Sequence, residues 1–278
     1  MGRIVGGVGI SHVPSVGVAV DKKQMQTPAW KPLWDGTEPA RRWLARIKPD
    51  IAIVVYNDHG ADFFFDKYPT FAVGAADRYA IGDEGFGVRP LPPLKGDAAF
   101  SWHLCESLIY DEFDLTVCQE MALEHGFLVP MNLLFPHEPD WPLAVVPFEV
   151  NVIQHPLPTA RRCFKLGQAI RRAVDSYPRD LRVVILGTGG MSHQLNGRRF
   201  GHMNRDWDGW FLDTIEAKPE QLADITHDEI MRKAGAEAVE LIMWLVMRGA
   251  MTPRVKQIHR HYYAPMTTGM GLLALEDA

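Results

Sequence analysis

The sequence predicts an α/β fold with a central mixed, largely parallel sheet flanked by helices on both faces. Short β-rich runs alternate with longer helical segments, as expected when crossover helices join the strands of one sheet. Two of these runs, 51–56 and 183–186, are apolar at every position rather than at every second position. Continuous apolar runs are typical of strands that are covered on both faces.

The chain has 278 residues, of which 47% are apolar and 23% charged. At this length roughly three quarters of the unfolded surface can be buried, so neither disulfides nor a structural metal is needed for folding. Nothing along the chain resembles a repeat or a flexible linker. We therefore expect a single domain over residues 1–278.

Four strands and four helices are predicted in chain order. The strands are 4–10, 51–56, 143–152 and 183–186, and the first three helices are 38–47, 97–110 with Asp97 as N-cap, and 159–176. The last helix is predicted as one long segment. Thr226 and Glu229 fit a capping box at its start, and Gly249, preceded by Arg248, marks its end.

Histidines outnumber cysteines by 11 to 3, so any metal site is expected to use nitrogen and oxygen ligands. His12, His59 and His193 each come shortly after a predicted strand, where α/β sheets bind ligands. Two imidazoles and one carboxylate form the facial triad of non-haem Fe(II) oxygenases, which leaves a third histidine for proton transfer. The remaining histidines are interpreted as structural or surface residues: His103, His137, His155, His202, His227, His259 and His261.

A carboxylate for such a triad stands in the last helix. Glu240 interrupts the otherwise apolar stretch 239–247, and Glu237, three residues earlier, shares its helix face. Spacing alone leaves open which of them is buried or whether both face solvent. A buried carboxylate must be paired or bind a metal, because its desolvation is costly.

The glycines at 187, 189 and 190 do not form a dinucleotide fingerprint, because Ser192 stands where the third glycine is required. We interpret them as positions where the backbone approaches a crowded site.

Composition excludes several classes of protein. A net charge of −5 argues against nucleic-acid binding. Cys105, Cys118 and Cys163 form no CxxC pair, which favours a reducing, cytoplasmic location. The stretch 4–20 contains Ser11, His12 and Pro14, so we expect neither a signal peptide nor a membrane-spanning segment.

Several motifs in order resemble one enzyme family. They are Ser11-His12, Val55-Tyr56-Asn57-Asp58-His59, Asp83-Glu84-Gly85, Glu124-His125-Gly126, the stretch from Gly187 to Gln194, and Glu240-Leu241 to Arg248-Gly249-Ala250. Over essentially its whole length the chain resembles the catalytic subunits of class III extradiol ring-cleavage dioxygenases, which act on protocatechuate or gallate.

The resemblance implies a role for each matching residue. His12, His59 and Glu240 would be the Fe(II) ligands, which selects Glu240 over Glu237. His193 would be the acid/base, His125 would lie beside substrate and oxygen, and Asn57 would belong to the pocket or support the ligands. Thr267 and Thr268 follow Pro265 in the substrate-carboxylate segment. The protocatechuate enzyme has a Ser-Asn pair there, and a threonine looks more like the gallate-cleaving branch.

The resemblance also implies the reaction, which is O₂-dependent cleavage of a carboxylated catechol beside its diol. We place protocatechuate, cleaved at the 4,5 bond to a carboxy-hydroxymuconate semialdehyde, slightly ahead of gallate or methylgallate. A separate small α subunit completes the site, or the chain stands alone or as a homo-oligomer. The alternatives are a Zn²⁺-dependent hydrolase with the same His/His/Glu set and a binding protein that has lost its metal.

Overall fold

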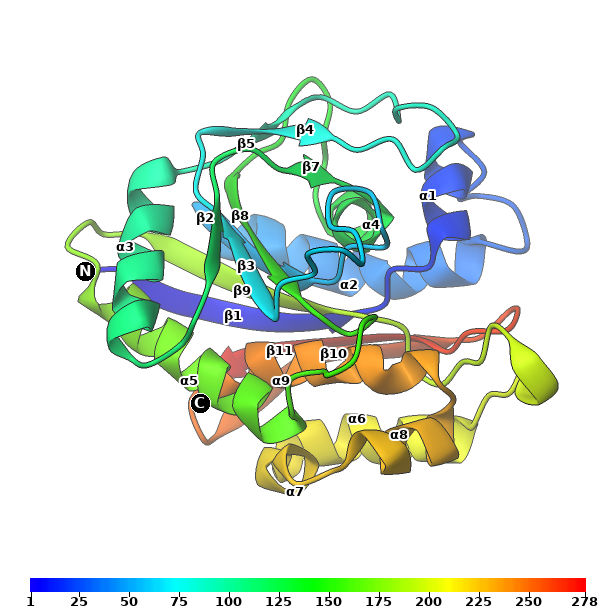
Figure 1. Cartoon of the computed structure of the whole chain (residues 1–278). Helices are drawn as coiled ribbons and strands as arrows, with labels where there is room; N and C mark the ends of the chain where they lie inside the picture. Colours follow the sequence, from blue (N-terminus) through cyan, green and yellow to red (C-terminus); the bar gives the residue numbers. More distant parts are fainter.

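A sheet of eight strands runs through the molecule in the order β10-β11-β1-β9-β2-β8-β3-β6 (Figure 1). The computed structural model describes all residues, 1–278. The four central strands are mutually parallel: β1 (Arg3–Ile10), β9 (Arg182–Thr188), β2 (Ile51–Tyr56) and β8 (Ala144–Val150). Strand β11 (Met270–Asp277) is antiparallel to both β1 and β10 (Val255–Tyr263). Strand β3 (Phe71–Gly74) is antiparallel to β8 and parallel to β6 (Thr116–Cys118). The predicted mixed, largely parallel sheet is confirmed.

Helices cover both faces of this sheet. On one face lie α3 (Ala98–Tyr110), α5 (Ala160–Ser176) and α9 (Ile242–Gly249), and on the other α1 (Pro14–Asp21), α2 (Lys31–Ile47) and α4 (His125–Leu134). Alternate residues of β2 enter the two cores: Ile53 packs with the first set of helices, and Val54 with the second. Burial on both sides explains why β2 is apolar at every position.

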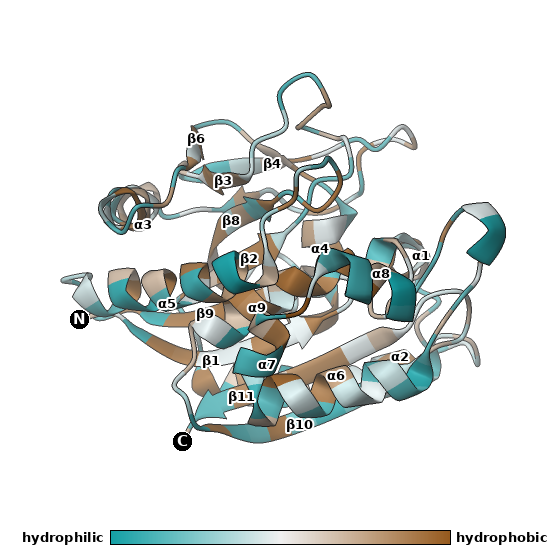
Figure 2. Ribbon diagram, turned by 60° about the horizontal axis from the view of Figure 1, so that its bottom comes forward, coloured by the Kyte–Doolittle hydropathy of each residue, from teal (hydrophilic) through white to brown (hydrophobic).

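Three further helices form an outer layer beyond α5 and α9: α6 (Arg205–Ala217), α7 (Pro219–Ala223) and α8 (His227–Ala234). In Figure 2 the exposed α8 is largely hydrophilic, whereas α9 and the central strands are largely hydrophobic. A small second sheet pairs β5 (Leu94–Lys95), β4 (Arg78–Ile81) and β7 (Ala122–Leu123). None of the helices has the length and apolar character needed to cross a membrane.

The prediction of one long helix over 226–249 is wrong. The segment contains α8, then a short 3₁₀ turn η2 (Glu237–Leu241), then α9. Gly235 causes the break, because its φ of +108° is not helical and an added Cβ would lie 1.9 Å from the carbonyl oxygen of His193. The predicted start is confirmed, since Thr226 accepts a hydrogen bond from the Glu229 amide. The break allows η2 to approach the loop after β9.

The other predicted elements are present, and all but one of them have ends within two residues of the prediction. Asp97 and Thr159 cap α3 and α5 as side-chain acceptors at their N-termini. Helix α2 begins at Lys31 rather than at residue 38. The sequence does not predict α4, which begins where the residues 124–126 indicate only a turn.

Candidate active site

Three predicted site histidines follow neighbouring parallel strands. His12 follows β1, His193 follows β9 and His59 follows β2, and β9 lies between the other two. The carboxyl ends of the three strands therefore meet at one edge of the sheet. There the ring centroids of His12 and His59 are 5.2 Å apart.

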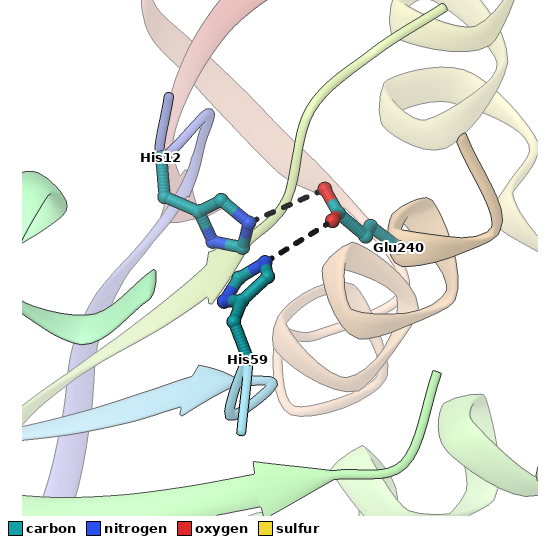
Figure 3. A group of neighbouring side chains, drawn as sticks. All are labelled: His12, His59 and Glu240. Atoms are coloured by element: carbon teal, nitrogen blue, oxygen red, sulfur yellow. Dashed lines mark ion pairs between the residues drawn. The ribbon is translucent and has the colours of Figure 1, made fainter. Parts of the chain in front are cut away.

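Glu240 reaches the same place from η2 (Figure 3). Its Oε2 lies 3.3 Å from Nε2 of His12, and its Oε1 lies 3.7 Å from Nε2 of His59. Glu240 is only 7% exposed. Glu237 points elsewhere, since its carboxylate accepts hydrogen bonds from the Leu195 amide and the Asn196 side chain.

This His/His/Glu group fits a divalent metal ion. Its three ligand atoms lie within 4.8 Å of one another. Nδ1 of His12 lies 3.0 Å from the hydroxyl of Thr188, whereas its Nε2 is buried without a hydrogen-bond partner. A buried polar atom left unpaired is costly, and coordination would remove that cost. Two nitrogens and one carboxylate oxygen are a donor set suited to Fe(II) and to Zn²⁺.

Two of the three groups already have the charge that a metal requires. Burial lowers the pKa of His12, which favours the neutral imidazole that a metal requires. Burial alone would raise the pKa of Glu240, but the neighbouring imidazoles of His12 and His59 hold it well below its usual range. The carboxylate is therefore ionised. At the third group, burial alone would lower the pKa of His59, but the carboxylates of Glu124 and Glu240 raise it to about 10, so metal binding would displace a proton there.

Glycines bring the loop after β9 against Glu240. An added Cβ on Gly189, whose φ is +126°, would lie 2.7 Å from Cβ of Glu240. One on Gly190 would lie 2.7 Å from Cε1 of His193. The interpretation of these glycines as points of close backbone approach is confirmed.

His193 is buried beside the group, with its Nε2 4.0 Å from Oε2 of Glu240. Its Nδ1 lies 2.7 Å from the carbonyl oxygen of Met191. Because a carbonyl oxygen only accepts, Nδ1 carries the proton and donates it. In the neutral ring the lone pair is therefore on Nε2, the nitrogen that lies nearest Glu240.

Two threonines of the predicted substrate segment lie next to this loop. Thr268 is buried and forms an isolated antiparallel bridge with His193. Thr267 is half-buried, and its methyl group lies near Gly201, 3.8 Å from where a Cβ on that glycine would be. Thr268 is therefore the one that adjoins a predicted catalytic residue.

His125 opens helix α4 and lies against His59, with ring centroids 4.1 Å apart. Its Nδ1 is 2.6 Å from Oε2 of Glu124 and also contacts Oε1 of Glu84. Burial alone would lower the pKa of His125, but the carboxylates of Glu124 and Glu84 raise it.

Asn57 lies at the same cluster. It is fully buried, with its Nδ2 3.2 Å from Nε2 of His59 and its Oδ1 without a hydrogen-bond partner. Its unpaired amide oxygen leaves a position where a bound substrate or water can donate a hydrogen bond.

Sequence reasoning missed two supporting carboxylates. Asp208 accepts hydrogen bonds from the amide and hydroxyl of Ser192 and from the hydroxyl of Tyr262, and so anchors the loop that holds His193. Glu124 hydrogen-bonds Nδ1 of His59 and lies 2.6 Å from Nδ1 of His125. The position of Glu124 directly before His125 indicates a contact between these two residues. Its contact with His59, which is distant in the sequence, can be seen only in the folded structure.

The cluster contains a second group with metal-ligand residue types, His59, Glu124 and His125. Here Nδ1 of His59 hydrogen-bonds Glu124 at 3.2 Å, and Nδ1 of His125 lies 2.6 Å from the same carboxylate while it hydrogen-bonds Glu84. His59 belongs to both groups and presents a different nitrogen to each. We therefore interpret the second group as support for the first.

Comparison with known proteins gives a consistent result. Residues 6–273 match the family model of the catalytic LigB subunit of aromatic ring-opening dioxygenase. The chain is 47% identical over 197 residues to a gallate dioxygenase of Pseudomonas putida, covering 71% of this chain and 58% of that protein. It is 29% identical over 256 residues to a 2,3-dihydroxyphenylpropionate/2,3-dihydroxicinnamic acid 1,2-dioxygenase of Burkholderia vietnamiensis, covering 76% and 78% of the two chains.

The fold is also found in a solved structure. An uncharacterized protein from Escherichia coli K12 superimposes with a TM-score of 0.60 at 12% identity, over 99% of this chain and 100% of that one. At this identity the likeness concerns the fold alone.

Proposed function

Because the chain belongs to the family of catalytic LigB subunits of aromatic ring-opening dioxygenases, we propose that it is an Fe(II)-dependent extradiol dioxygenase. It would cleave a carboxylated catechol beside the diol and place both atoms of O₂ in the product. Residues 1–278 would form one catalytic domain. We infer a reducing, cytoplasmic location from Cys105, Cys118 and Cys163, which form no disulfide.

The observation that carries this proposal is the buried group His12, His59 and Glu240 at the carboxyl edge of the parallel strands. We propose these three as the metal ligands. Bound Fe(II) would supply the redox chemistry that links the catechol to O₂, which Zn²⁺ cannot supply. His59 is the most accessible ligand, with 27% of its side chain exposed, so substrate would enter from its side.

We assign the proton transfer to His193. Its Nε2 is free to take a proton from a catechol hydroxyl, because Nδ1 is held by the Met191 carbonyl. The same nitrogen would return the proton during ring opening. His125 would hydrogen-bond an oxygen of the reacting group, and Asn57, with its unpaired Oδ1, would contact the substrate beside His59.

For the substrate we now favour gallate. The expected preference for protocatechuate is not confirmed, whereas the relative at 47% identity is a gallate dioxygenase. Thr267 and Thr268, which stand where the protocatechuate enzyme has Ser-Asn, point the same way. We propose that Thr268, beside His193, helps to hold the substrate carboxylate or a ring hydroxyl.

The decisive experiment is anaerobic reconstitution with Fe(II), followed by O₂ uptake with gallate, protocatechuate, methylgallate and catechol. We expect uptake of one O₂ per ring cleaved, with gallate the fastest substrate. Reconstitution with Zn²⁺ should give no uptake. If the iron protein consumes no O₂ with any of these catechols, while the zinc protein hydrolyses an ester or amide, the hydrolase alternative replaces this proposal.

The match covers 58% of the length of the gallate dioxygenase. Loops that carry site residues also expose apolar side chains. They include Phe64, Phe65, Phe86, Leu195, Phe200 and Met266. The loop of Phe65 carries His59, and that of Phe86, which is 97% exposed, carries Glu84. We propose that a small α subunit covers these loops, because large apolar side chains exposed on loops that carry site residues are candidates for burial against a partner.

Co-expression with the α subunit of a protocatechuate 4,5-dioxygenase, followed by light scattering on a sizing column, tests this. We expect a complex with the wild-type chain and none with the double variant Phe65→Asp and Phe86→Asp. If the chain instead forms a dimer by itself, and the double variant is monomeric, the same surface binds a second copy.

A further inference from the structure

We propose that Glu124 is a positioning residue whose single oxygen Oε2 holds the Nδ1 atoms of both His59 and His125. It would thereby orient a metal ligand and the neighbouring substrate-side histidine together. This inference rests on the proposed function only in naming His59 a ligand, and its tests need neither catechol nor O₂.

The geometry centres on one carboxylate. Oε2 of Glu124 lies 3.2 Å from Nδ1 of His59 and 2.6 Å from Nδ1 of His125. Its other oxygen, Oε1, accepts a 2.8 Å hydrogen bond from the Gly126 amide at the start of α4. The two oxygens therefore act differently, since Oε1 caps the helix and Oε2 binds the imidazoles.

These contacts decide which nitrogen of His59 can bind a metal. An ionised carboxylate only accepts hydrogen bonds, so Nδ1 of His59 must carry its proton. Nε2, which lies 3.7 Å from Glu240 and 3.2 Å from Nδ2 of Asn57, then carries the lone pair that can coordinate a metal. Carboxylates that bind the far nitrogen of a ligand histidine fix its ring orientation and strengthen the ligand.

Glu124 is well placed for this role because it cannot move freely. Its side chain is completely buried, and it precedes a helix whose first residue is His125. Gly126 allows the close approach, since an added Cβ there would lie 2.7 Å from the carbonyl oxygen of Asn57. Helix α4 and the loop after β2 are thus held together at the site.

The first test is the substitution Glu124→Gln. The amide oxygen of Gln can keep the cap on the Gly126 amide, which places the NH₂ group against the two Nδ1 atoms. The NH₂ group of Gln and the Nδ1–H group of His59, both donors, would then face each other. We expect Zn²⁺ to bind the metal-free protein about 10- to 100-fold more weakly, by isothermal titration.

A second measurement reports the hydrogen bond itself. In the Zn²⁺-loaded wild-type protein, the Nδ1–H protons of His59 and His125 should give slowly exchanging, downfield ¹⁵N-coupled resonances. In Glu124→Gln the His59 resonance should disappear or move upfield. His125 should keep its own, because Glu84 also contacts its Nδ1.

Glu84→Gln is the matched control, since Glu84 touches His125 but makes no hydrogen bond to His59. It should leave Zn²⁺ affinity within about twofold of wild type and should not alter the His59 signal. Glu124→Asp is the control for a loss of folding. Aspartate is a preferred N-cap and keeps the charge, but its carboxylate is one methylene shorter and draws back from the imidazoles. It should also weaken Zn²⁺ binding.

The outcomes are distinct. Unchanged Zn²⁺ affinity and an unchanged His59 resonance in both Glu124 variants would overturn the positioning role, even if the enzyme cleaves catechols. Two Zn²⁺ ions per wild-type chain would overturn it as well, because Glu124 would then be a ligand. If the variants behave as expected but no catechol is cleaved, the positioning role stands and the proposed dioxygenase function fails.

Discussion

The backbone amide of Gly190 donates a 2.6 Å hydrogen bond to Oε2 of Glu240. This bond joins the loop after β9 to η2, two segments that are fifty positions apart in the chain. The same oxygen lies 3.3 Å from Nε2 of His12. The position of the proposed metal-binding carboxylate therefore depends on how closely the glycine loop can approach it.

Gly189→Ala should disrupt the metal group. The added Cβ would lie 2.7 Å from Cβ of Glu240, and the φ of +126° is unfavourable for alanine. We expect a loss of stability of about 1–3 kcal/mol from backbone strain, together with weaker metal binding. Thermal unfolding and isothermal titration with Zn²⁺ would measure the two effects.

Gly197→Ala separates strain from the clash. Gly197 also has a positive φ, +70°, but an added Cβ would meet nothing within 4 Å. This variant should lose some stability and keep wild-type metal affinity. Equal metal affinities for the two variants would show that the close approach at Gly189 is unimportant for the site.

Glu240→Ala should abolish stoichiometric Fe(II) binding. It removes the only carboxylate of the proposed triad and leaves Nε2 of His12, already without a hydrogen-bond partner, with no anion beside it. Iron analysis after anaerobic reconstitution measures the effect, and Glu237→Ala is the control because Glu237 bonds to Leu195 and Asn196 instead. A Glu240→Ala protein that binds one iron and turns over would show that the triad is wrongly assigned.

His193→Ala should slow the reaction without removing the metal. His193 makes no hydrogen bond to the three proposed ligands, and its Nε2 stays 4.0 Å from Glu240. We expect iron content and catechol affinity close to wild type and a kcat lowered about a hundredfold or more, as for the loss of a general acid/base. Steady-state O₂ uptake and anaerobic catechol titration check this, and an unchanged kcat would rule out the proton-transfer role.

The sequence predicted the part of the site that depends on strand ends. His12, His59 and His193 were brought together by topology, because each follows a parallel strand and those strands are neighbours. For Glu240 the residue pattern left two candidates. The resemblance chose between them, and the buried position of Glu240 supports that choice.

What sequence reasoning missed depends on contacts between distant segments. The helix over 226–249 has good local signals, yet Gly235 must pass the carbonyl of His193 and breaks it. The bond of Glu124 to His59 spans 65 positions, and no local pattern encodes it. The complete burial of Glu149, a charged residue within strand β8, is likewise not indicated by any local pattern.

Glu149 gives a prediction about pH. Neither of its carboxyl oxygens has a hydrogen-bond partner, and the hydroxyl of nearby Tyr68 donates to the Asp58 backbone carbonyl instead. Burial, and then the negative charge of Asp58, raise the pKa of Glu149 well above its usual value. The folded protein therefore keeps this proton at a pH where the unfolded chain has released it.

The sign of the effect follows from this proton balance. Below the unfolded pKa of about 4.3 both states are protonated, and above it stability falls until pH reaches the raised folded pKa. Glu149→Gln cannot ionise, so its melting temperature should exceed that of wild type at pH 7, and the difference should shrink towards pH 4. Each kcal/mol gained would raise the melting temperature by roughly 2–4 °C. Glu106→Gln, at an exposed position of α3, should show no such trend. A Glu149→Gln protein that falls further below wild type in melting temperature as pH rises from 4 to 7 would mean that Glu149 is ionised and stabilising in the fold.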